Sequence, residues 1–337
     1  MNRGKVPENI LKRSVLRQAG MNKGNVACGA GIGRDCAIFP FAGESTLVYC
    51  MQEAAVGPGA CGAPGESFMT LGGLIQKCAN NLAAGGSLPL AVMITLLLPE
   101  NTGEAVLRGM MEEAAGKCRE LSMEIAGGQS RVTAAAAAPM AVVAGYGRTF
   151  ENSRYTGKIE PGQDVVLSKW IGLQGTAVLA ERHRERLLQR YPAYLVEEAA
   201  DFGRYLSVLP EAAAAVKYGV CAMHDASEGG IFGALWELAE GAGAGLQIDM
   251  RKLPLRQETV EVCECCNVNP YELMSGGCLV MTAEDGFGLV QALAAEGIPA
   301  AAVGKVTAGK ERILRNGEEI RYMNRPGRDG IYADASS

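Results

Sequence analysis

The sequence has no long hydrophobic run, no long run of charge of one sign and only two histidines among its 337 residues. Its longest apolar stretch, Leu88 to Leu98, is much shorter than the roughly 20 residues of a membrane-spanning helix and suits a buried strand. The first residues are polar, unlike the apolar core of a signal peptide. No basic stripe accompanies the net charge of −5. We therefore expect neither a membrane nor a nucleic acid as a partner.

Paired cysteine motifs are also lacking. The eleven cysteines are scattered, and their odd number fits free thiols in a reducing compartment, so we expect a cytoplasmic protein. The one dense group is Cys263-Glu264-Cys265-Cys266. On a helix, Cys265 would lie well round from Cys263 and Cys266, and no histidine is near in sequence to complete a metal site. We interpret these cysteines as structural thiols.

Length and composition predict two domains. Hydrophobic residues make up 48% and charged residues 20%, as in globular proteins, and the chain is too long for one small core. A polar connector over 147–161, rich in Asn, Ser, Gly and Pro, separates two halves. We therefore expect an N-terminal domain over 1–150 and a C-terminal domain over 151–337. Each half mixes strands with helices, which gives an α/β (α+β) fold class.

The spacing of apolar residues places the expected elements. In the first half we expect helices over 7–19, 67–82 with Ser67 as cap, and 104–121, with strands over 36–41, 46–51, 91–98 and 134–146. In the second half we expect helices after Gly175, over 193–216, after Gly230 and over 257–267, with strands over 164–169, 246–249, 279–282 and 301–306. The glycine-rich segment 29–33 lacks the lysine and the following helix of a phosphate-binding loop, and we interpret it as a turn.

The segment from Met223 to Gly230 is the strongest candidate site in the second half. The start of a helix leaves backbone N–H groups for an anion, and Gly229 and Gly230 let a ligand approach the backbone. In a loop, His224 could orient a ligand, although one imidazole is weak evidence for acid–base catalysis. A simpler interpretation stays open: Ser227 caps the helix and Asp225 fixes the turn.

Five segments, in order, resemble the superfamily of aminoimidazole ribonucleotide synthetase, selenophosphate synthetase, thiamine-monophosphate kinase and the hydrogenase maturation factor HypE. Gly33-Arg34-Asp35-Cys36-Ala37 is similar to the family segment Gly-Asp-Asp-Ala-Ala, Asn80-Asn81-Leu82-Ala83 to Asn-Asp-Leu-Ala, and Gly127-Gly128-Gln129-Ser130 to Gly-Gly-Asp-Thr. Met223 to Gly230 resembles Met-Arg-Asp-Pro-Thr-Arg-Gly-Gly, and Asn269-Pro270-Tyr271 resembles Asp-Pro-Leu. The resemblance covers nearly the whole chain, and the HypE branch is the most similar.

The resemblance implies a two-domain PurM-like fold, with an N-terminal mixed sheet that forms a barrel across a homodimer and a C-terminal α/β domain. ATP and Mg²⁺ would bind between the domains, and ATP would activate an amide-type oxygen, as in a carbamoyl dehydratase of hydrogenase maturation with a maturation protein as partner. Asp225 and Glu228 would be catalytic and Asp35 would bind the metal. The cofactor-binding residues would be Asp35, Gln52, Asn81, Gly127, Gly128, Gln129, Ser227, Gly229 and Gly230.

Departures from the family pattern weaken the expected metal site. Gln52, Asn81 and Gln129 stand where the family carries aspartates, and amides are poor ligands for hard cations. We expect these three side chains to face one cavity whose negative charge is reduced. The last cysteine, Cys278, falls in an expected core strand, so we do not expect the chain to modify a terminal cysteine of its own.

Three functions therefore remain open. The first is an ATP-dependent enzyme that acts on an external amide or thiocarboxamide. The second is a non-catalytic dimeric binding or assembly protein of the same fold. The third is a binder of a different phosphate ligand without a metal, because amides suit neutral polar groups.

Overall fold

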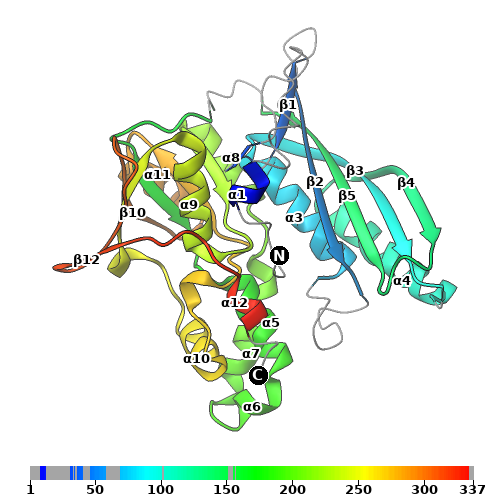
Figure 1. Ribbon diagram of the computed structural model, residues 1–337. Helices are drawn as coiled ribbons and strands as arrows, with labels where there is room; N and C mark the ends of the chain where they lie inside the picture. The colour runs from blue at the N-terminus through cyan, green and yellow to red at the C-terminus, as the bar shows by residue number, and fades with distance from the viewer. Residues whose placement is uncertain are drawn as a thin grey trace.

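The computed structural model describes residues 8–12, 31–32, 34, 36–40, 46–57, 69–100, 102–150, 155 and 157–333. Two β-sheets, each with helices packed beside it, form two lobes (Figure 1). The short helix α1 (Glu8–Leu11) lies near the middle of the molecule. The expected α/β architecture is confirmed.

Within the described ranges, the first lobe is a five-stranded sheet of order β1-β2-β5-β3-β4 covered by helices α3 and α4. Neighbouring strands are antiparallel, except that β3 and β4 are parallel. Helices α3 and α4 pack against one face and bury its apolar side chains. In chain order the elements are β1 (Ala37–Pro40), β2 (Thr46–Ala55), α3 (Leu71–Ala84), β3 (Ser87–Leu98), α4 (Glu104–Glu120), β4 (Glu124–Val132) and β5 (Met140–Thr149).

Helix α3 is nearly completely buried. Leu71, Leu74, Ile75, Cys78 and Leu82 recur at helical spacing, and all five lie in the core of the first lobe. Its N-cap is Thr70, whose Oγ1 accepts a hydrogen bond from the Gly73 nitrogen at 3.1 Å. The helix therefore begins later than we expected, and the expected cap, Ser67, lies outside the described residues.

Three strands of the first lobe differ from expectation. β3 begins before Ala91 and runs through Pro89, and a register shift against β5 between Pro89 and Ala91 accommodates the missing N–H. β5 begins at Met140 because residues 134–139 form turns. β4 was not expected, since its residues are mostly exposed and its composition has no strand-like alternation. Most of the helix expected over 7–19 lies outside the described residues.

The second lobe has a seven-stranded sheet of order β12-β11-β8-β10-β6-β9-β7. In chain order its elements are β6 (Asp164–Ser168), α5 (Leu173–Arg182), α6 (Arg184–Leu188), α7 (Ala193–Ala200), the 3₁₀ helix η2 (Asp201–Tyr205), α8 (Leu209–Tyr218), β7 (Ala222–Asp225), α9 (Gly230–Ala242), β8 (Gly245–Asp249), η3 (Met250–Lys252), α10 (Gln257–Cys266), η4 (Pro270–Glu272), β9 (Leu279–Ala283), α11 (Gly286–Ala295), β10 (Ala300–Thr307), β11 (Arg312–Asn316), β12 (Glu319–Tyr322) and α12 (Gly330–Ala333).

The helix expected over 193–216 is interrupted. Residues 206–208 are not helical, and α8 starts anew with Pro210 in its first turn, where proline is tolerated. The expected loop at Met223–Asp225 is instead strand β7, which pairs with β9 at one edge of the sheet. Strands β11 and β12 were also not expected.

The two lobes share an apolar core at their junction. Ala83 and Ala84, at the end of α3, pack in one cluster with Val208, Ala212 and Met223 of the second lobe. Helix α3 contacts both α8 and β7 (Figure 1). None of the helices in the described ranges is both long and apolar enough to span a membrane.

Candidate functional site at the junction of the lobes

Asn81 and Asp225 come from different lobes, on elements that contact each other. Asn81 lies in the last turns of α3 with 7% of its surface exposed, and Asp225 ends β7 with 3% exposed. Because α3 packs against β7, the candidate segments around these residues meet where the lobes join.

Gln52 and Gln129 are not part of one cavity with Asn81 within a single chain. The registers align Gln52 with Val143, Ile94 and Gly128, so Gln52 lies on the helix-covered face of the sheet. Gln129 instead aligns with Thr95, Val142 and Glu53 on the opposite face. Three strand spacings, about 14 Å, also separate β2 from β4. The expected shared cavity is therefore wrong for one chain. Gly127 and Gly128 lie with Gln129 on the exposed strand β4.

Asp225 belongs to a group of buried charges at the ends of β6 and β7. Lys169 directly follows β6, and its Nζ lies 2.5 Å from Oε1 of Glu211 on α8. Burial raises the pKa of the Cys278 thiol to about 12, while Lys169 lowers it and Asp225 and Glu211 raise it further. These three charges therefore lie within electrostatic reach of one buried thiol. Cys278 is fully buried directly before β9.

The start of α9 is shaped by backbone packing. Gly229 and Gly230 have φ angles of 91° and 65°, a left-handed conformation that favours glycine. A side chain at Gly230 would collide with the backbone of Glu272, so the close approach is to the protein itself. Ser227 is not the cap of α9. The N-cap residue is Gly229, and the main-chain oxygen of Ser227 accepts hydrogen bonds from Gly230 and Ser275.

A carboxylate of the same chain occupies the start of α9. Asp329 Oδ2 accepts a hydrogen bond from the Gly229 nitrogen at 2.6 Å, and Oδ1 accepts from Ile331 and Met274 at 2.9 and 3.3 Å. Burial raises the pKa of Asp329 to about 6, although these backbone N–H groups lower it. Burial raises the pKa of the Tyr332 hydroxyl of α12 to about 12, and the nearby Glu228 and Asp329 carboxylates raise it further. The position expected to attract an anionic ligand is therefore filled by Asp329.

Sequence reasoning missed Asp329. The available signal was Asp329-Gly330 at the start of α12, where Asp is a preferred N-cap and does accept from Ile331 two residues later. The capping pattern predicts this local contact. It does not predict that α9 lies on the other side of the carboxylate.

Histidine and cysteine do not extend the site. His224 lies in strand β7 and not in a loop, and its Nε2 is 3.1 Å from Glu237 Oε2 on α9. The expected helix over 257–267 is confirmed as α10, and Cys263, Cys265 and Cys266 are all buried.

The described residues do not fit a Mg²⁺ site. Across the ranges that the structure describes, no group of three His, Cys, Asp or Glu side chains is placed to hold a metal ion. Asp35, the expected metal ligand, lies outside these ranges. Gln52 and Asn81 offer amide oxygens only, which bind hard cations weakly without carboxylates.

The sequence matches the family models described as AIR synthase related protein, with the N-terminal domain over residues 33–149 and the C-terminal domain over 160–315. It is 30% identical over 214 residues to a carbamoyl dehydratase HypE from Rhodobacter capsulatus, covering 62% of this chain and 61% of that relative. The match thus spans less than two thirds of that protein. A putative hydrogenase expression/formation protein from Methanocaldococcus jannaschii is 23% identical over 279 residues, covering 82% and 79% of the two chains.

Solved structures show the same fold. HypE from E. coli superposes with a TM-score of 0.69 at 22% identity, over 85% of this chain and 88% of that chain. A hydrogenase maturation protein HypE in complex with ATP gives a TM-score of 0.68 at 17% identity over 98% of both chains. With both domains matched, the chain belongs to the AIR synthase related protein family, within the PurM-like superfamily.

Proposed function

We propose that this protein is a HypE-like member of its family that uses ATP to activate an amide-type oxygen, as a carbamoyl dehydratase does in hydrogenase maturation. The family match over both domains supports the proposal. The meeting of the Asn81 and Asp225 segments supports a site at the junction of the lobes. We place the domain boundary between Phe150 and Glu151, in the connector between the sheets.

Asp225 and Glu228 are the proposed catalytic carboxylates. Asp35, Asn81, Ser227, Gly229 and Gly230 are proposed nucleotide contacts. A phosphate at Gly229 has to replace the Asp329 carboxylate, because both would use the same N–H group. Any Mg²⁺ would depend on Asp35, and we derive no step through a metal.

We further propose a homodimer through the helix-free face of the first sheet. This face exposes large apolar side chains, which on a monomer mark an interaction surface. They are Met51, Leu88, Leu90, Met93 and Met140. A second copy that covers this face would also lie against Gln129, which is on the same face, whereas Gln52 is on the other. Met93→Glu should convert the dimer to a monomer in light scattering, whereas a wild type that is already monomeric contradicts the proposal.

Calorimetric titration with ATP, with and without Mg²⁺, tests the central proposal. The wild type should bind ATP and hydrolyse it faster when a carbamoyl or thiocarboxamide compound is present. Asp225→Asn and Glu228→Gln should abolish the stimulated hydrolysis. The matched control is Asp249→Asn, at a carboxylate at the end of β8. This variant should keep the stimulated hydrolysis. Absence of binding at millimolar ATP would refute the proposal.

A second candidate is a non-catalytic binding or assembly protein of the same fold, acting beside a maturation protein. A structure of a HypE–HypF complex is among the similar folds, and it supports a maturation protein as the class of partner. The amides at Gln52 and Asn81 and the filled start of α9 favour this candidate. A wild type that binds ATP or another phosphate compound, yet shows no turnover with any carbamoyl donor, would support it.

A further inference from the structure

Residues 205–208, here called the coupling segment, connect η2 to α8 and are held by the first lobe. Asn80 of α3 donates from Nδ2 to the Leu206 oxygen at 2.7 Å, and its Oδ1 accepts from the Val208 nitrogen at 3.1 Å. Asn80 is 3% exposed. One side chain thus satisfies two main-chain groups of the other lobe.

The second lobe holds the same segment through Lys169. Its Nζ donates to the Tyr205 and Ser207 oxygens at 2.8 and 2.6 Å and pairs with Glu211 at 2.5 Å. The three protons of the ammonium group are therefore used. Main-chain groups of the coupling segment alternate between the lobes, with 205 and 207 bound by Lys169 and 206 and 208 bound by Asn80.

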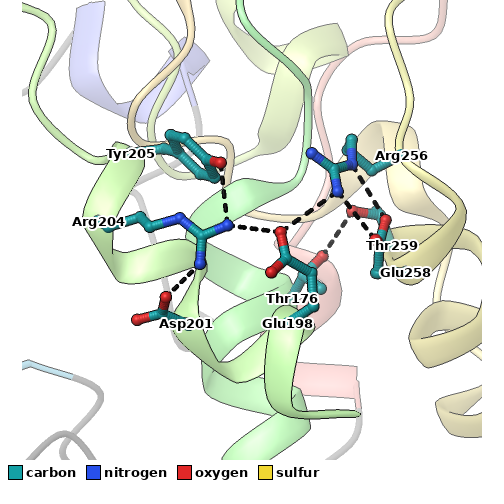
Figure 2. A network of polar contacts seen from close by, with 8 residues as sticks. All are labelled: Thr176, Glu198, Asp201, Arg204, Tyr205, Arg256, Glu258 and Thr259. Atoms are coloured by element: carbon teal, nitrogen blue, oxygen red, sulfur yellow. Dashed lines mark hydrogen bonds and ion pairs between the residues drawn. The ribbon is translucent and has the colours of Figure 1, made fainter. Parts of the chain in front are cut away.

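A polar network fixes the start of the coupling segment to α7 and α10 (Figure 2). Arg204 binds Glu198 and Asp201, and it reaches the Tyr205 hydroxyl at 2.9 Å. Glu198 also pairs with Arg256 at 3.3 Å, and Arg256 pairs with Glu258 at 2.9 Å. This network thus links η2, where the coupling segment begins, to α7 and α10 of the second lobe.

Aromatic contacts and backbone geometry support the same conclusion. The Trp170 ring lies 5.4 Å from the Tyr205 ring, and the Arg256 guanidinium lies 4.9 Å from the Trp170 ring. Lys169 itself has a φ of 51°, which is rare for a residue other than glycine and persists only where the surroundings impose it. These contacts fix the position of the coupling segment relative to the second lobe.

We propose that Asn80 is a positioning residue that couples the two lobes through residues 205–208. By fixing α3 to this segment, it sets Asn81, the next residue, relative to Asp225 on β7. The role of Asn81 and Asp225 as site residues rests on the proposed function. The coupling of the lobes by Asn80 does not depend on that function. Loss of Asn80 leaves a buried carbonyl and a buried N–H group unpaired, which is a large penalty for a single side chain.

Hydrogen exchange and calorimetry test the coupling without any ligand. Asn80→Ala removes both contacts, and Asn80→Asp keeps the acceptor for Val208 but loses the donor to Leu206. The control is Leu74→Met, because Leu74 is also buried in α3 but packs in the core of the first lobe, and a Leu-to-Met exchange nearly conserves volume. In Asn80→Ala, peptides covering 205–209 should exchange about tenfold faster or more, and the single thermal transition should separate into two.

Asn80→Asp should give an intermediate exchange rate, and Leu74→Met should behave as wild type. If Asn80→Ala does not fold, the exchange rate of Asn80→Asp at 205–209 decides whether the proposal holds. The proposal is overturned if the Asn80 variant exchanges at 205–209 like Leu74→Met and melts in one transition. Where the wild type binds ATP, Asn80→Ala should weaken that binding about tenfold and Leu74→Met should leave it unchanged. A wild type without ATP binding refutes the proposed function and leaves the coupling test intact.

Discussion

The carboxylate of Asp329 lies 2.6 Å from the backbone nitrogen of Gly229, so a residue near the C-terminus holds the start of α9. The same carboxylate binds Met274 and Ile331, which joins three separate segments at one buried charge. Negative charge is stabilised at the N-terminus of a helix, where N–H groups are unpaired. Asp329 therefore holds these segments of the second lobe together.

Asp329→Asn should destabilise the protein. The amide keeps one oxygen for Met274 and Ile331 but turns an NH₂ group toward the Gly229 N–H group, or the reverse. The free energy of unfolding should fall by about 1–3 kcal/mol in urea titrations, the cost of an unsatisfied buried group. Glu124→Gln, at an exposed carboxylate on β4, should change it by less than about 0.5 kcal/mol. Equal effects of the two substitutions would contradict the assignment.

The charge of Asp329 should also set a pH dependence. Burial raises its pKa from 3.8 to about 6 in the folded protein. The folded state therefore binds this proton more tightly than the unfolded state. The stability gained from this tighter proton binding is complete below pH 4 and is lost as the pH rises through 6. The free energy of unfolding should therefore fall by about 2 kcal/mol between pH 4 and 7.

Comparison of wild type with Asp329→Asn isolates this contribution. The difference in unfolding free energy between the two proteins should change with pH in this window. Glu240, whose pKa is lowered to about 2 chiefly by Lys12, acts in the opposite direction. Its contribution is present above about pH 4.5 and is the same in both proteins. A difference that stays constant from pH 4 to 7 would show that Asp329 keeps an ordinary pKa.

Lys169→Met should be among the most destabilising single changes. It leaves Glu211, which is 2% exposed, as a buried charge without its partner, and two carbonyl oxygens of the coupling segment lose their donor. A loss of about 3–5 kcal/mol is expected. Addition of Glu211→Gln should recover part of this loss in a double-mutant cycle, since no buried charge then remains. Additive effects would argue against the pair.

Gly145→Ala should disturb the core of the first lobe. A Cβ atom there would collide with the Cys78 sulfur, which lies 3.4 Å from the Cys50 sulfur beneath β5. We expect a loss of about 1–3 kcal/mol, and Cys78→Ala in the same chain should relieve it. Gly109→Ala is the control, because nothing lies near that position on α4, and it should stabilise by up to about 1 kcal/mol.

Local patterns predicted the buried helices well and the long-range contacts poorly. The apolar spacing of α3 and the span of α10 follow from the sequence, because a helix that buries one face needs only its own periodicity. Strand β4 carries exposed Gly127 and Gly128 and pairs in parallel with β3, so neither alternation nor a hairpin turn predicts it.

The same limit applies to the candidate site. The segments around Asn81 and Asp225 could be identified from the sequence, but the order of the first sheet decides where Gln52 and Gln129 lie. Asp329 and Lys169 act on groups that are tens of residues away in the chain. Asn80 belongs to the segment Asn80-Asn81-Leu82-Ala83 that resembles the family, yet its partners at 206 and 208 are visible only in the folded chain.

Asn80 and Lys169 both bind main-chain atoms between positions 205 and 208, and this has an evolutionary consequence. Substitutions at 206 and 207, whose side chains are only partly buried, would keep the same carbonyl groups, so these two side chains can vary as long as the backbone path is kept. Proline at position 208 is the exception, because it removes the only hydrogen that Asn80 accepts from this stretch. Relatives could therefore keep the same domain placement while differing in the side chains at positions 206 and 207.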